Sequence, residues 1–146
     1  KWNVRKVTRM QGMFFQASAF DGDLSKWDVG QVTFMDNMFN GASSFNQDLS
    51  KWDVGKVTNM RNMFGDAESF NQDLSRWNVG QVIDMSTMFK GAISFKQVLY
   101  GVAWVNSKSR KGNMFRDSHG SIARQTFFSP QNSADLTSAV KECLGL

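Results

Sequence analysis

Residues 45–64 read FNQDLSKWDVGKVTNMRNMF, and close copies of this phrase lie before and after it at a spacing of 25 residues. The spacing is marked most clearly by the tryptophans Trp2, Trp27, Trp52 and Trp77. A period of a few dozen residues is typical of repeat proteins, in which each unit buries its apolar face against neighbouring copies. The sequence therefore predicts a stack of similar coils.

The first half of each unit has the spacing of a strand. Leu49, Trp52 and Val54 occupy the apolar places of the leucine-rich pattern L-x-x-L-x-L, and the last two, two residues apart, face the same side of a strand. Gly55, Gly30 and Gly80 close this segment, where we expect positive φ or close packing. A short parallel strand is predicted here.

The second half of each unit has helical spacing. Met60, Met63, Phe64 and Ala67 fall at i, i+3, i+4 and i+7, with Thr58 ahead of them as an N-cap. The expected fold class is α/β, a leucine-rich-repeat-like solenoid with one short parallel strand and one short helix in each coil. The nine methionines and thirteen phenylalanines could form a soft-metal or peptide site, but their period favours core ladders.

Acidic residues recur at the corner before each strand, at Asp23, Asp48 and Asp73. Such a series could bind calcium, as other solenoids do. Each corner offers one carboxylate, and the last copy has Val98 in this place. Hydrogen bonding to turn amides is therefore the favoured interpretation.

The repeat register changes near the C-terminus, which suggests three regions. Residues 1–95 form a four-coil array whose first coil is incomplete, and residues 96–128 form a degenerate closing coil in which the tryptophan ladder is lost at Trp104. A proline follows Ser129, and the apolar spacing beyond it predicts a capping or linker helix over residues 129–146.

The string at residues 45–64 strongly resembles the 25-residue repeat of the BspA-like leucine-rich-repeat surface proteins of bacteria, mycoplasmas, protists and algae. The resemblance covers about residues 1–95 and includes the specific W-D-x-x-x-V-T-x-M-x-x-M-F phrase. Cysteine is frequent in that family at the place of Ala42, Ala67 and Ala92. The resemblance implies attachment at a cell surface to host or matrix proteins.

Composition excludes several classes of function. The net charge of +4 is divided unevenly, with basic ends at residues 1–20 and 96–146 around an acidic middle at residues 21–95, which argues against a nucleic-acid groove. No apolar run is long enough to span a membrane. No triad, phosphate loop or metal cluster is recognisable, and His119 is expected in a solvated loop. We expect no enzyme activity, no cofactor and no metal.

Charged residues flank the inward tryptophan and valine of each coil and form two columns on the outer face. We name these the charged columns and assign them as candidate partner-binding residues: Lys26, Asp28, Lys51, Asp53, Arg76 and Asn78. They form either a solvated face of mutually neutralising charge or a recognition surface. The stacking of like charges within a column is relieved by the opposite column beside it.

Two functions remain open. The first is a non-enzymatic protein–protein interaction module, a fragment of a longer repeat protein that binds protein partners at the cell surface or outside the cell. The alternative is a structural linker in a larger complex, such as a membrane-associated organellar assembly of an alga, which would use the open N-terminal coil, the basic ends or the C-terminal tail. An adhesin should leave the charged columns free.

Overall fold

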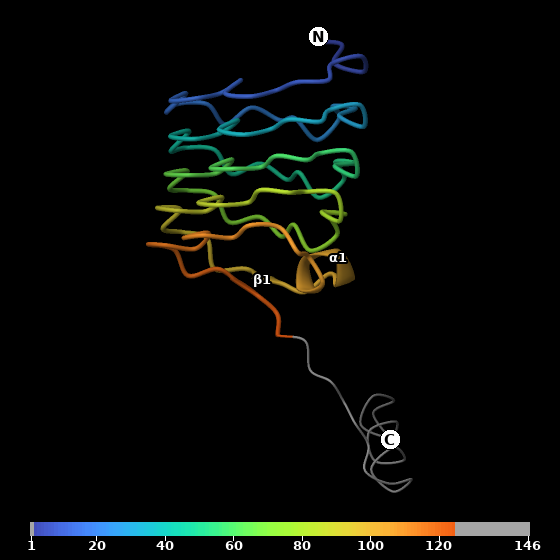
Figure 1. The fold of residues 1–146 in the computed structure, drawn as a ribbon. Helices are drawn as coiled ribbons and strands as arrows, with labels where there is room; N and C mark the ends of the chain where they lie inside the picture. Colours follow the sequence, from blue (N-terminus) through green and yellow to red (C-terminus); the bar gives the residue numbers. More distant parts are fainter. Residues whose placement is uncertain (1, 125–146) are drawn as a thin grey trace, which may run out of the picture.

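The protein is described by a computed structural model over residues 2–124. Figure 1 shows the chain winding through successive layers, each lying directly against the one before it. Backbone hydrogen bonds join neighbouring layers at the sequence spacing of the repeat: the Thr33 N–H donates to the Thr8 carbonyl and the Thr58 N–H to the Thr33 carbonyl, both at 2.8 Å. The described chain is therefore a stack of coils.

Regular secondary structure in the described residues is confined to their C-terminal part, residues 98–122. It consists of the strands β1, Val98–Leu99, and β2, Ser121–Ile122, which pair in parallel, and the short helix α1, Val102–Val105. Elsewhere in residues 2–124 the coils are joined by single parallel bridges. These bridges form one column down the stack: Arg9, Phe34, Asn59, Asp84 and Arg110.

The expected strand around Trp52 and Val54 is not formed, although both side chains point inward as predicted, with 3% and 1% of their surface exposed. The reason is that the backbone turns within the coil. The Trp52 N–H donates to the Leu49 carbonyl at 3.0 Å, and the Val57 N–H donates to the Val54 carbonyl at 2.9 Å. Amides that are used in these turns cannot pair with the neighbouring coil.

The expected helix over Met60–Ala67 is also absent, because two residues of this segment have left-handed backbone. Asn62 has φ 56° and Asp66 has φ 53°, and a right-handed helix requires negative φ. Each is the third residue of a turn closed by an i+3→i hydrogen bond, the place where a type II turn requires positive φ. A series of three overlapping turns, closed by the amides of Met63, Gly65 and Ala67, therefore replaces the helix.

The same two left-handed places recur in each of the five coils. The first is occupied by Gly12, Asn37, Asn62, Thr87 and Asn113. The second is occupied by Gln16, Gly41, Asp66, Gly91 and Asp117. Most of these residues are glycine, asparagine or aspartate, the types that enter left-handed backbone at least cost. Gly30, Gly55 and Gly80, for which positive φ was considered, are not among them.

The turns leave every second amide free to reach the next coil. The Asn62 N–H donates to the Ser86 carbonyl at 3.0 Å and the Phe64 N–H to the Met88 carbonyl at 2.9 Å, while the amides of Met63 and Gly65 close turns within their own coil. Thr58 does not act as a helix cap, since its hydroxyl donates to the Thr33 carbonyl at 3.2 Å. Backbone groups are thus satisfied without helix or sheet.

The core consists of ladders of identical side chains. Met60, Met63 and Phe64 are fully buried, which confirms the interpretation of the methionines and phenylalanines as core residues. The Phe64 ring stacks on Phe39 of the preceding coil with 5.5 Å between ring centroids. The Trp52 indole N–H donates to the Leu24 carbonyl at 3.0 Å, so this tryptophan also forms a polar link between coils, as do Trp77 and Trp104.

The prediction that the tryptophan ladder ends before Trp104 is wrong. Trp104 is 1% exposed, and its indole N–H donates to the Leu74 carbonyl at 2.9 Å, as Trp77 does to Leu49. The two extra residues between Leu99 and Trp104 are taken up by α1, on which the buried Trp104 lies. The capping or linker helix predicted at residues 129–146 lies outside the described residues, and the leucine-rich-repeat class of the solenoid stays a prediction.

Truncation of an inner tryptophan should destabilise the stack strongly. We expect Trp52→Ala to lower the free energy of unfolding by about 3–5 kcal/mol, since it leaves a cavity and frees the Leu24 carbonyl. The control is Trp2→Ala, whose side chain is 70% exposed and should cost about 0.5 kcal/mol. Urea unfolding followed by circular dichroism measures both, and equal effects of the two variants would contradict the core role.

Thr87 is a strained residue whose replacement should stabilise the protein. It is the one β-branched residue at a left-handed place in the described chain, with φ 57°, where other coils have asparagine or glycine. We expect Thr87→Asn to raise the free energy of unfolding by about 1 kcal/mol. The reciprocal change Asn62→Thr should lower it, and a gain of stability in that variant would refute the explanation.

Candidate functional site

The six residues of the charged columns are all exposed. The alternation around the inward Trp52 and Val54 places Lys51 and Asp53 on the outer surface. The column formed by Asp28, Asp53 and Asn78 accepts hydrogen bonds from the backbone. The Asp53 Oδ1 accepts the Gly55 N–H at 3.0 Å. Asp28 and Asn78 accept the equivalent amides of Gly30 and Gly80 at 3.2 and 3.1 Å, respectively.

The two charged columns do not neutralise each other by direct contact. Within residues 2–124, Lys26, Lys51 and Arg76 form no ion pair. The ion pair on this face joins Arg5 to Asp28 at 3.6 Å, and both side chains are more than half exposed. Exposed pairs of this kind contribute at most about 1 kcal/mol, so the cationic heads of the columns remain available to a partner.

The acidic corners hold turns together, as predicted. The Asp48 Oδ1 accepts the Ser50 N–H at 2.8 Å, and Asp23 and Asp73 make the same bond to the serine two residues on. Hydrogen bonds from the Ser50 amide and hydroxyl lower the pKa of Asp48 against the opposing effect of partial burial, and the charge of Lys51 adds to the lowering. The carboxylate is therefore a structural acceptor.

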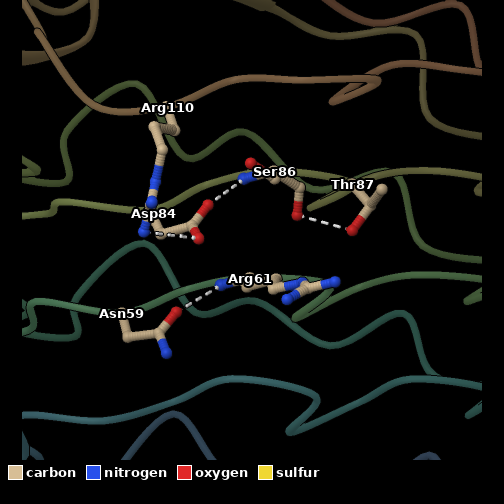
Figure 2. A network of polar contacts seen from close by, with 6 residues as sticks. All are labelled: Asn59, Arg61, Asp84, Ser86, Thr87 and Arg110. Atoms are coloured by element: carbon tan, nitrogen blue, oxygen red, sulfur yellow. Dashed lines mark hydrogen bonds and ion pairs between the residues drawn. The ribbon is translucent and has the colours of Figure 1, made fainter.

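A second polar region follows the column of β-bridges. Figure 2 shows Asp84 at its centre, with Oδ2 3.1 Å from Nη2 of Arg110 and Oδ1 accepting the Ser86 N–H at 2.8 Å. One coil away, the Asn59 Oδ1 accepts the Arg61 N–H at 3.0 Å. Asp84 is the least exposed carboxylate in an ion pair of the described chain, with 15% of its side chain exposed.

The pKa of Asp84 lies below its ordinary value of 3.8. Partial burial raises this pKa, but the hydrogen bonds from the Ser86 hydroxyl and amide, together with the charges of Arg110 and Arg61, lower it by more. Asp84 is thus an ionised carboxylate whose charge is already balanced by Arg110.

Beside this network lies an open hollow of about 480 Å³, which we name the polar hollow. It is lined by Asp36, Asn37, Asn59, Arg61, Asn62, Thr87 and Lys90. Sequence reasoning missed it, because its residues come from three coils and several depart from the repeat. The available signal was Arg61, which stands where other coils have Gln11, Asp36 and Ser86.

The N-terminal end of the stack carries an apolar hollow of about 420 Å³, which we name the apolar end. Its lining residues are Trp2, Phe14, Phe20, Asp23, Leu24 and Trp27. The rings continue the core ladder, since Phe14 stacks on Phe39 with 5.4 Å between centroids. Trp2 is 70% exposed, whereas its equivalent Trp52 is 3% exposed between two coils.

The described part of the chain contains neither a cluster of metal-ligating side chains nor a membrane-spanning helix. Over residues 2–124, no three His, Cys, Asp or Glu side chains lie together in a way that could hold a metal ion. The same residues contain no helix with the length and apolar character needed to cross a bilayer. His119 is exposed, as expected for a loop residue.

Comparison with known proteins places the chain in a family. Residues 1–119 match the family described as "Mycoplasma protein of unknown function, DUF285", and the chain therefore belongs to the DUF285 family. The match supports a relation to surface repeat proteins, while the specific repeat motif expected from residues 45–64 remains a proposal. No curated protein and no solved structure matches the chain.

The lowered pKa values predict loss of stability in acid. A carboxylate with a lowered folded-state pKa stabilises the fold above its unfolded pKa, and this contribution disappears as the pH falls through the folded value. We therefore expect the urea midpoint to fall below about pH 3.8, the ordinary value for Asp48 and Asp84. Asp84→Asn should reduce this pH dependence relative to the wild-type protein, because the variant lacks one of the carboxylates with a lowered pKa. An acid profile identical to that of the wild-type protein would contradict this role of Asp84.

Proposed function

We propose that the chain is a non-enzymatic protein–protein interaction module, a cell-surface adhesion or recognition fragment of a longer repeat protein. The observation that carries this proposal is the set of cationic side chains, Lys26, Lys51 and Arg76, which are exposed in register and make no ion pair within residues 2–124. Regularly spaced charges on a rigid support can match a complementary surface and accelerate association.

The family supports the same proposal in a broader way. The chain belongs to DUF285, and residues 45–64 carry the repeat phrase of BspA-like leucine-rich-repeat surface proteins. On this basis we propose a leucine-rich-repeat-like solenoid located at the cell surface or outside the cell. The apolar residues that recur in each coil pack between coils. Binding residues should therefore be exposed ones, such as those of the charged columns.

An enzymatic role has less support in the described residues. The acidic corners accept backbone amides, and Asp84 is balanced by Arg110 at 3.1 Å. Neither arrangement pairs a general acid with a general base, and His119, the one histidine, is exposed. We therefore propose a binding role that requires no cofactor.

The alternative proposal is a structural linker in a larger, membrane-associated organellar complex, which would contact its partner through the apolar end. A hollow lined by indole and phenyl rings would release water on contact with an apolar partner, at about 25 cal/mol per Å² of apolar area buried. The aromatic residues of the apolar end also have the character of interface anchors. The two proposals use different surfaces and can be separated.

Charge reversal in the columns tests the first proposal. We expect Lys51→Glu combined with Arg76→Glu to weaken binding to immobilised, purified extracellular-matrix proteins at least tenfold, because attraction becomes repulsion. The matched control is Lys96→Glu with Lys108→Glu, two exposed lysines outside the columns, which carries the same charge change. Surface plasmon resonance measures the affinity, and urea unfolding confirms that both proteins are folded.

The outcomes separate the two functions. Binding that is lost with the column variant and retained with the control supports recognition through the charged columns. Binding that survives column reversal but is lost in Trp2→Ala would assign the contact to the apolar end instead. Equal weakening by the column variant and the control would show that only net charge matters, and would remove the columns as a specific site.

A further inference from the structure

The polar hollow crosses three neighbouring coils and lies apart from the charged columns, none of whose six residues line it. Its lining is polar throughout, with two cationic side chains, one carboxylate, three amides and a hydroxyl. Repetition does not explain this composition, because Arg61 and Lys90 each occur at their place in one coil only. A hollow with this chemistry is suited to a polar, charged ligand.

The cationic groups of the hollow are not neutralised by the protein. Asp84, the nearby carboxylate, forms its ion pair with Arg110 at 3.1 Å, and Figure 2 shows no contact between the Arg61 side chain and Asp84. Within residues 2–124, neither the Arg61 guanidinium nor the Lys90 ammonium has an ion pair or a hydrogen bond. A guanidinium offers planar, paired donors that match a carboxylate or a sulfate group.

The amides of the hollow provide additional donors. The Asn62 Nδ2 donates to the Asn37 Oδ1 at 3.0 Å, and the Asn59 Oδ1 accepts the Arg61 N–H at 3.0 Å. These bonds use one polar atom each of Asn37 and Asn59, and leave their amide nitrogens facing no protein acceptor in the described chain. Unpaired amide N–H groups can donate to ligand oxygens such as hydroxyl or ring oxygens.

Asp36 differs from these residues because its carboxylate is a hydrogen-bond acceptor and requires a donor on the ligand. Its Oδ1 is buried and has no hydrogen-bond partner among the described residues. The buried Oδ1 is out of reach of a ligand in the hollow, whereas Oδ2 is not among the buried atoms and also has no hydrogen bond within residues 2–124. Sulfate would be repelled by this carboxylate and brings no hydrogen to Oδ2, whereas a hydroxyl group can donate to Oδ2. The ligand should therefore combine an anionic group for Arg61 and Lys90 with a hydroxyl group for Asp36.

Acidic saccharides have this combination, since each acidic ring carries a carboxylate or a sulfate group among several hydroxyls. We propose that the polar hollow binds one acidic sugar unit of a saccharide chain, with its anionic group on Arg61 and Lys90 and a hydroxyl group on Asp36. No aromatic ring lines the hollow, so it offers no surface on which a nucleobase could stack. An acidic peptide is the competing occupant.

The test is a titration of the 146-residue chain with a hyaluronan hexasaccharide, in which glucuronate alternates with N-acetylglucosamine, followed by isothermal titration calorimetry. We expect saturable binding, and at least tenfold weaker binding of the neutral hexamer of N-acetylglucosamine. Arg61→Ala and Lys90→Gln should each weaken hyaluronan binding about tenfold or more. Lys108→Ala removes an exposed cation outside both the hollow and the charged columns and should leave the affinity unchanged.

Several results would overturn the proposal. These are the absence of hyaluronan binding, equal weakening by Arg61→Ala and Lys108→Ala, or equally tight binding of inorganic sulfate. If hexaglutamate binds more tightly than the saccharide, and Arg61→Ala also weakens the binding of hexaglutamate, the occupant is an acidic peptide. The result is independent of the proposed protein-binding function, because the Lys51→Glu and Arg76→Glu variant leaves the hollow intact and should still bind the saccharide.

Discussion

The architecture depends on how the backbone amides of each coil are shared between turns and neighbouring coils. In the segment that follows each β-bridge residue, successive backbone N–H groups donate in turn to their own coil and to the next coil. The Met63 N–H closes a turn on the Met60 carbonyl, and the Phe64 N–H donates to the Met88 carbonyl of the next coil at 2.9 Å. This alternation requires left-handed backbone at two places in each coil, as at Asn62 and Asp66. Each coil is therefore held by hydrogen bonds within its own turns and by hydrogen bonds to its neighbours. This allows short repeats to stack without regular helices or long strands.

The side-chain ladders are a consequence of the same geometry. Because each coil lies in register on the last, Phe39 and Phe64 stack at 5.5 Å, and the Trp52 indole reaches the Leu24 carbonyl. A coil alone would expose one face of each ring, so burial becomes complete only between two neighbours. The apolar end shows this directly, since Trp2 is largely exposed where Trp52 is buried.

The surface divides into regions with different physical character. The charged columns expose cations such as Lys51 next to carboxylates already used by turn amides, which suits recognition of a protein surface. The polar hollow is lined by the unpaired cations Arg61 and Lys90 and by the carboxylate of Asp36, and it favours a small charged ligand. The apolar end exposes rings of the kind that a neighbouring coil covers elsewhere in the stack. The charged columns and the polar hollow share coils but no residues, so a repeat protein with both could bind more than one partner at once.

The sequence by itself determined the period, the stacked arrangement and the direction of the side chains, because burial at fixed spacing leaves a strong one-dimensional pattern, and Trp52, Val54 and Met60 all proved buried. The exposed positions of the charged columns followed from the same alternation. The tertiary structure decided which backbone groups form hydrogen bonds with each other. The apolar spacing of Met60, Met63 and Phe64 is compatible both with a helix and with a series of turns. The positive φ angles of Asn62 and Asp66 select the turns. It also decided the fifth coil at Trp104 and the polar hollow, since both depend on contacts between residues about 25 positions or more apart, which no local pattern records.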